Sequence, residues 1–133
     1  MRVPGALYVV VLCVCVAPIA SAQDAVKVDP THYSVITEND RVRVLKIHYG
    51  AHEKSVMHSH PDSVAVFLTD AKVQFTGSDG KTNESQIKAG ESLYTSAQVH
   101  LPENVGDQPM EAILVELKGK PAKPAKPAKE MKK

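Results

Sequence analysis

Residues 57–61 read Met57-His58-Ser59-His60-Pro61, a His-x-His pair that is followed directly by proline. Successive side chains of a β-strand point to opposite faces, so residues two apart lie on the same face. A strand here would present the His58 and His60 imidazoles together, and proline, which has no amide donor, is typical of a strand end. Such a pair could bind a metal, or it could be a surface pair or a hydrogen-bonded buried histidine. The pair alone leaves these interpretations open.

The sequence on both sides of the pair has the period of β-strands. Alternating apolar and polar residues predict strands at 33–37 and 41–49, and Asp79-Gly80 predicts a hairpin turn within 78–81. No segment offers ten residues of helical period. We therefore expect an all-β domain, an antiparallel sandwich or barrel of the class that includes the jelly roll. Further short strands are expected from Val56 and at 63–68, 72–76, 84–87, 92–95, 99–101 and 110–117.

A third histidine lies forty residues after His60, in the run Val99-His100-Leu101-Pro102-Glu103-Asn104. In a small barrel every strand passes within reach of the interior. His100 could therefore meet the pair inside the barrel.

The first 22 residues have the layout of a secretory signal peptide. A positive start precedes an apolar core at 6–16 and the small-residue cleavage site Ala20-Ser21-Ala22. The core is shorter than the roughly 20 apolar residues of a membrane span, so we expect no span; a retained N-terminal anchor is the alternative. Both cysteines, Cys13 and Cys15, fall in this segment. A secreted or periplasmic mature chain would thus have no disulfide and would depend on its core or on a metal.

The sequence predicts four parts: the signal peptide at 1–22, a leader at 23–32, one barrel domain at 33–118 and a tail at 119–133. About 95 residues between the signal peptide and the tail suit a single small domain. Three histidines are expected away from the pair: His48 and His52 at the surface and His32 in a flexible leader.

The tail and the preceding domain differ in charge. From Lys118 onward the chain repeats Pro-Ala-Lys three times and has seven lysines against Glu130, a net charge of +6. Residues 23–117 have eight Lys or Arg against fourteen Asp or Glu, a net charge of −6. Such a tail does not form a packed core; it could contact anionic surfaces or act only as a solubilising end. It lacks aromatic residues for base stacking, so we expect no sequence-specific nucleic-acid binding.

The two histidine segments resemble the paired motifs of small single-domain cupins. The first cupin motif has a glycine, then His-x-His-Pro; here Gly50 precedes residues 58–61. The second opens on a glycine and an acidic residue and closes on His-x-x-x-Asn; here these are Gly90-Glu91 and residues 100–104. The resemblance covers 35–118. It implies a jelly-roll barrel with a divalent transition metal (Fe, Mn, Ni, Cu or Zn, which imidazole ligands do not distinguish) bound by His58, His60 and His100.

The chain departs from the first motif where a metal-binding glutamate is expected. Ala65 stands there, five residues after His60, and Ala71 replaces the later glycine. Certain cupin dioxygenases are similar in using three histidines, so the resemblance still implies a metal centre. That centre would have open coordination positions, suited to an anionic or bidentate oxygen ligand. Asp62 and Glu103 are alternative carboxylates, although the chain is expected to turn outward at both.

Four residues are candidates for the lining of a ligand pocket: Phe67, Phe75, Tyr94 and Gln98. Phe67 is expected to share the inward face of Ala65, and Gln98, two residues before His100, could orient a substrate. Ordinary core packing is the alternative for the three aromatic residues.

Three classes of function stay open, because a fold does not decide among them. The first is a metal-dependent oxygenase or isomerase acting on a small polar molecule, with Tyr94 or Gln98 orienting the substrate. The second is a non-catalytic binding module for a metal or small ligand. The third is a structural module without metal whose sheet faces serve for homodimerisation. No general base is visible in the motifs apart from the histidines, which favours binding or chemistry of the metal alone.

Overall fold

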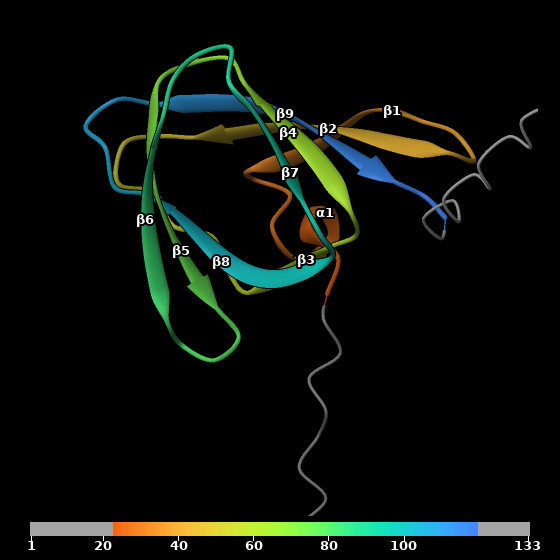
Figure 1. The fold of residues 1–133 in the computed structure, drawn as a ribbon, viewed down its shortest axis with the longest axis horizontal. Helices are drawn as coiled ribbons and strands as arrows, with labels where there is room; N and C mark the ends of the chain where they lie inside the picture. Colours follow the sequence, from red (N-terminus) through yellow and green to blue (C-terminus); the bar gives the residue numbers. More distant parts are fainter. Residues whose placement is uncertain (1–22, 120–133) are drawn as a thin grey trace, which may run out of the picture.

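The computed structural model describes residues 23–119, which form a β-barrel with one short helix (Figure 1). The predicted signal peptide and nearly all of the predicted tail lie outside the described residues. In chain order the elements are α1 (Ala25–Val28), β1 (Tyr33–Glu38), β2 (Val42–Tyr49), β3 (His58–His60), β4 (Ser63–Phe67), β5 (Ala71–Gly77), β6 (Thr82–Ile87), β7 (Ser92–Thr95), β8 (Gln98–Asn104) and β9 (Met110–Leu117).

The strands form two sheets that face each other across the barrel (Figure 1). The larger sheet has the order β1-β2-β9-β4-β7 and the smaller one β3-β8-β5-β6, with antiparallel pairing throughout. Neighbours such as β2 and β9 come from opposite ends of the domain, because the chain crosses repeatedly between the sheets. The predicted all-β antiparallel class is confirmed.

The core between the sheets follows from the alternation along the strands. In β9 the buried positions Met110, Ala112 and Leu114 alternate with half-buried ones, and in β2 Leu45 and Tyr49 are fully buried. Residues two apart on a strand share a face, so these side chains meet in one apolar cluster.

The predicted hairpin turn joins β5 to β6. Thr76 pairs with Thr82, and the Gly77 amide donates to the Lys81 carbonyl at 2.8 Å. Gly80 has φ of +79°, a left-handed conformation that glycine adopts without steric cost. The Asp-Gly pair therefore marks the reversal correctly.

β8 is longer than the predicted strand and contains Pro102. The Pro102 carbonyl accepts from the Ser55 amide, which lies in the loop between β2 and β3. Strand β3 pairs with Gln98 to His100 and ends before it reaches Pro102. A loop and not a strand therefore lies beside Pro102, so its missing amide donor breaks no strand pairing there.

The predicted leader packs as part of the domain. Ala25 is fully buried, and the Ser59 amide in β3 donates to the Gln23 carbonyl at 2.8 Å. His32 stacks on Tyr49 with ring centroids 4.2 Å apart and hydrogen bonds to Asp29 at 2.7 Å. The expectation that His32 lies in a flexible leader is therefore wrong: its half-buried ring packs against Tyr49 of β2.

Within residues 23–119 the structure has no helix long and apolar enough to cross a membrane.

Candidate metal centre

Three histidine side chains converge on the inner face of the smaller sheet. His58 lies opposite His100 in the antiparallel β3–β8 pair, and His60 follows two residues later on the same face. The ring centroids are 4.8 Å (58 to 60), 5.1 Å (58 to 100) and 5.4 Å (60 to 100) apart. One nitrogen from each ring lies within 4.8 Å of the others, and the residues are 0%, 5% and 8% exposed in sequence order.

The hydrogen bonds of His58 and the burial of His58 and His100 define their free nitrogens. His58 Nδ1 lies 2.7 Å from the Val56 carbonyl oxygen, which can only accept, so Nδ1 carries the proton and Nε2 has the free lone pair. The Nε2 atoms of His58 and His100 are buried and have no hydrogen-bond partner within residues 23–119. Buried polar atoms are nearly always hydrogen-bonded, so two buried nitrogens of this kind in one histidine cluster fit a metal site.

Burial also keeps two of the imidazoles, those of His58 and His100, neutral. Desolvation, with a smaller contribution from His60, lowers the pKa of His58 from 6.5 to about 4. Desolvation, helped by both neighbouring histidines, lowers the pKa of His100 to about 3. The neutral imidazole is the form that binds a metal. At neutral pH both lone pairs are therefore available.

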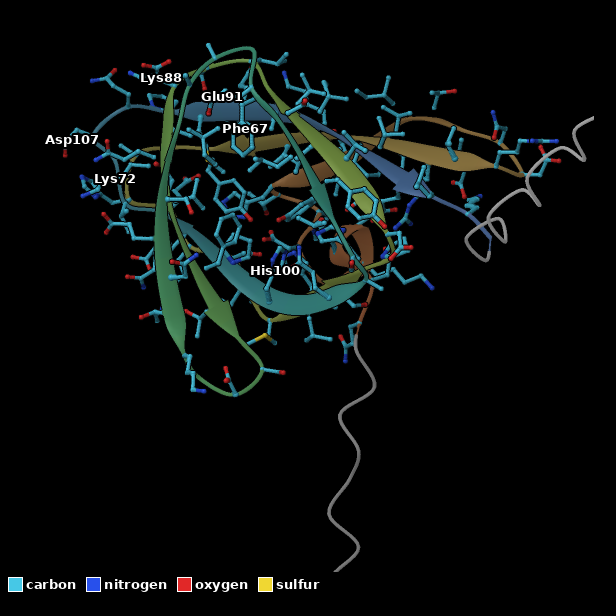
Figure 2. The ribbon with its side chains drawn as sticks, viewed as in Figure 1. Phe67, Lys72, Lys88, Glu91, His100 and Asp107 are labelled. Atoms are coloured by element: carbon cyan, nitrogen blue, oxygen red, sulfur yellow. The ribbon has the colours of Figure 1, made fainter. Side chains whose placement is uncertain are left out.

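Two of the histidines, His60 and His100, line a cavity of about 70 Å³ between the sheets. Figure 2 shows His100 pointing from β8 toward the larger sheet and Phe67 entering the same interior from β4. Among the described residues, no lysine, arginine, aspartate or glutamate lines the cavity, so its walls are mostly apolar. The lining residues are Tyr33, Ile47, Tyr49, His60, Ser63, Ala65, Phe67, Val73, Phe75, Leu93, Thr95, Gln98, His100, Pro102, Met110, Ala112 and Leu114.

Three of the four pocket candidates line this cavity: Phe67, Phe75 and Gln98. The Phe75 ring stacks on His100 with centroids 5.5 Å apart and planes at 20°. Tyr94 is 61% exposed and does not line the cavity, so its assignment to the pocket is wrong. The reason is strand alternation: Leu93 and Thr95 face inward on β7, which turns Tyr94 outward.

The carboxylates considered at the sequence level lie away from the histidines. Ala65 lines the cavity without a polar group. Asp62 is half-buried and accepts from the Ala97 amide at 2.7 Å, while Glu103 pairs with Lys54 at 3.5 Å. His48 and His52 are exposed, as expected.

A carboxylate that the sequence analysis missed lies beside the centre. Glu116 is 1% exposed, and its Oε1 accepts from His60 Nδ1 at 2.7 Å while its Oε2 accepts from Arg43 Nε at 2.5 Å. Burial raises the pKa of Glu116, but the His60 and Arg43 hydrogen bonds more than offset this, so the pKa falls below its ordinary value and the carboxylate is ionised. One signal could have found it: Glu116 continues the inward series of β9 two residues after Leu114.

Comparisons with known proteins bear on the fold. No family model matches the chain, and no curated protein matches it. A solved cupin domain from Bordetella pertussis Tohama I is 24% identical with a TM-score of 0.61, over 65% of this chain and 92% of the other. A cupin family protein with a double-stranded β-helix fold from Methanocaldococcus jannaschii is 17% identical with a TM-score of 0.53, over 68% and 84%. A Klebsiella pneumoniae protein with a double-stranded β-helix domain is 22% identical with a TM-score of 0.54, over 65% and 71%. The described part of this chain has the fold of a small cupin domain.

Proposed function

We propose that this protein binds a divalent transition metal through His58, His60 and His100 and uses it to hold a small ligand in the barrel. The supporting observation is the pair of buried, unpartnered Nε2 atoms on His58 and His100 within a three-histidine cluster. Leaving a buried polar group unpaired costs about 1–3 kcal/mol. A metal ion would bind both nitrogens at once. Fe, Mn, Ni, Cu and Zn all accept imidazole ligands of this kind.

The charge around the histidines fits a metal with open positions. Three neutral imidazoles leave the charge of a divalent ion uncompensated, and the adjacent Glu116 carboxylate is already paired with Arg43. An ion held there would supply Lewis acidity to a ligand that approaches through the cavity. The chain's own contribution is to orient the imidazoles and keep their surroundings dry.

The cavity supports a small ligand that is largely apolar, in contrast to the polar molecule expected from the sequence. A cavity of about 70 Å³ is about half of the 150 Å³ that accommodates benzene in an engineered protein core. Without a charged residue in the lining, no group besides the ion compensates a charged ligand. The hydroxyls of Ser63 and Thr95, 3.1 Å apart, and the Gln98 amide offer the polar contacts.

Binding is favoured over acid–base catalysis by the same lining. Among the described residues that line the cavity, His60 and His100 are the candidate proton-transfer groups, and the proposed metal would occupy their ring nitrogens. Any oxygenase or isomerase activity would therefore be carried by the ion itself.

Metal titration of the untagged protein tests the proposal. Wild type is expected to bind one equivalent of Co²⁺ or Zn²⁺, measured by calorimetry. His58→Ala and His100→Ala are each expected to lose more than the roughly 10- to 100-fold in affinity that loss of an outer partner costs. His48→Ala, which removes an exposed histidine, is the matched control and keeps wild-type affinity. A folded wild type that binds no metal would favour the alternative, a structural or ligand-binding module without metal.

Short hydroxamic acids then probe the cavity of the cobalt-loaded protein. Acetohydroxamate, a small metal chelator with a methyl tail, is expected to change the visible cobalt spectrum at low concentration. The monohydroxamate of succinic acid carries a carboxylate tail and should bind more weakly, because the lining has no cation to pair with it. Equal affinity for the two probes would contradict an apolar cavity.

We also infer export of the protein. Residues 1–22 have the composition of a signal peptide, although they lie outside the described residues. Determination of the N-terminal sequence of the protein from the periplasm or medium is expected to return Gln23; a chain beginning at Met1 and found only inside the cell would contradict export.

A further inference from the structure

Three charged side chains, Glu116, Arg43 and Asp24, form a hydrogen-bonded relay from His60 to the N-terminal segment. Glu116 Oε1 accepts from His60 Nδ1 at 2.7 Å, and Glu116 Oε2 accepts from Arg43 Nε at 2.5 Å. Arg43 Nη2 then donates to Asp24 Oδ2 at 2.5 Å. The relay thus joins β3, β9, β2 and the cap residue of α1.

The position of Glu116 is costly for a residue that only fills the core. It occupies an inward position of β9 in series with Ala112 and Leu114, where an apolar side chain would pack without desolvation of a charge. Buried ion pairs are often no more stabilising than well-packed apolar residues of the same size. The contact with His60 therefore suggests a role beyond stability.

The carboxylate determines which nitrogen of His60 faces the cavity. An ionised carboxylate only accepts hydrogen bonds, so His60 Nδ1 must carry the proton and Nε2 the free lone pair. Nδ1 and Nε2 lie on opposite sides of the imidazole ring, so Glu116 holds the ring from behind. Outer partners of this kind fix the tautomer and orientation of metal-binding histidines and raise their basicity.

We propose that Glu116 is the positioning residue of the metal centre and that Arg43 and Asp24 extend this support to the N-terminal segment. The proposal rests on the proposed metal-binding function. Glu116 acts through His60 and contacts the ion at no stage. Ala65 offers no carboxylate to a metal. Glu116 on the neighbouring strand β9 places one beside His60, where it supports the histidine and does not bind the metal.

The N-terminal segment supports the same ligand strand through its backbone. Asp24 forms an isolated parallel β-bridge with Ser59, the residue between His58 and His60. The Ser59 amide also donates to the Gln23 carbonyl at 2.8 Å. One short segment therefore holds both the backbone of β3 and the far end of the side-chain relay. Asp24 should influence metal affinity less than Glu116 does, because two further links separate it from His60.

Metal affinity and the cobalt spectrum of four proteins test the relay. Glu116→Gln is expected to weaken Co²⁺ binding about 10- to 100-fold and to change the ligand-field bands, because a neutral amide no longer polarises His60. Asp24→Asn is expected to weaken binding by a smaller factor. Glu111→Gln is the matched control: it removes a half-buried carboxylate of β9 that pairs with Lys46 away from the histidines, and it should stay within about twofold of wild type.

A measurement on the metal-free protein keeps this inference separate from the proposed function. In a long-range ¹H–¹⁵N spectrum of wild type at pH 8, His60 is expected to be protonated at Nδ1, and Glu116→Ala is expected to shift it toward the Nε2-protonated form. If Glu116→Ala changes the tautomer but the wild type binds no metal, the metal function is overturned and the role of Glu116 in orienting His60 is supported. Protonation of wild-type His60 at Nε2, or unchanged cobalt affinity in a folded Glu116→Gln, would overturn the positioning role.

Discussion

Two residues, Ala65 and Glu116, carry most of what is particular to this centre. Ala65 stands where the first cupin motif has a glutamate, and the cavity wall there is apolar. Glu116 lies across the β4–β9 pair, opposite Ser63, two positions along from the Ala65–Leu114 pair. In the candidate centre, the Glu116 carboxylate therefore lies beside His60, and the cavity wall at Ala65 is uncharged.

Restoring the glutamate should make the domain depend more strongly on its metal. Ala65→Glu places a carboxylate in a cavity lined by no cationic residue, so the metal-free variant should lose several kcal/mol of stability. A bound ion would compensate the charge, so Zn²⁺ should raise the melting temperature of this variant by more than that of wild type.

Ala65→Gln is the control for size in that experiment, since it adds the same number of heavy atoms without a charge. It should show a Zn²⁺-induced shift no larger than that of wild type. If Ala65→Glu gains no more from Zn²⁺ than Ala65→Gln does, then position 65 does not face the metal.

The sequence could place some of these residues and not others, for a geometric reason. The His-x-His pair depends only on the two-residue period of a strand, so its shared face could be predicted locally. Tyr94 was misplaced because the inward phase of a four-residue strand is poorly determined by its own sequence. Glu116 was missed because its partner, His60, is 56 residues away and in the other sheet.

At the level of elements, strands were predictable where their alternation was long. The predicted 41–49 and 110–117 agree with β2 and β9 to within one residue. β3 begins at His58, two residues later than predicted, because Val56 and Met57 are exposed and pair with no strand. Local β-propensity indicates a strand there, but pairing with β8 decides where it starts.

The helix α1 could not be predicted, since four residues carry no helical period. Isolated helices of this length are unstable in water, and this one is held by tertiary contacts. Asp24 caps its first turn, Ala25 is buried against the barrel, and Arg43 binds the cap residue from β2. Its presence gives the segment before β1 a structural role that composition did not indicate.

For the whole molecule, the buried histidines link stability to pH. The folded pKa values of His58 and His100, about 4 and about 3, lie below the ordinary 6.5. Between pH 6.5 and 4 the unfolded chain therefore binds protons that the folded chain does not, so the metal-free domain loses stability as the pH falls. Each histidine contributes up to about 1.4 kcal/mol per pH unit in this window.

Urea unfolding at pH 7, 6 and 5 in the presence of a chelator measures this effect. The free energy of unfolding should fall over this range in wild type, and His100→Gln should flatten the slope by the contribution of one proton. A wild-type free energy that is constant from pH 7 to pH 5 would show that these histidines are not buried in the neutral form.

The distance along the chain between His60 and Glu116 has a consequence for biosynthesis. A polypeptide is made from its N-terminus, and β3 is complete 56 residues before the carboxylate that orients its second histidine. His100, the cross-strand neighbour of His58, also follows late. A chain that ends before β8 and β9 therefore has the His-x-His pair without its third histidine and without Glu116. The proposed metal would bind the finished domain, after β9 has joined the sheet.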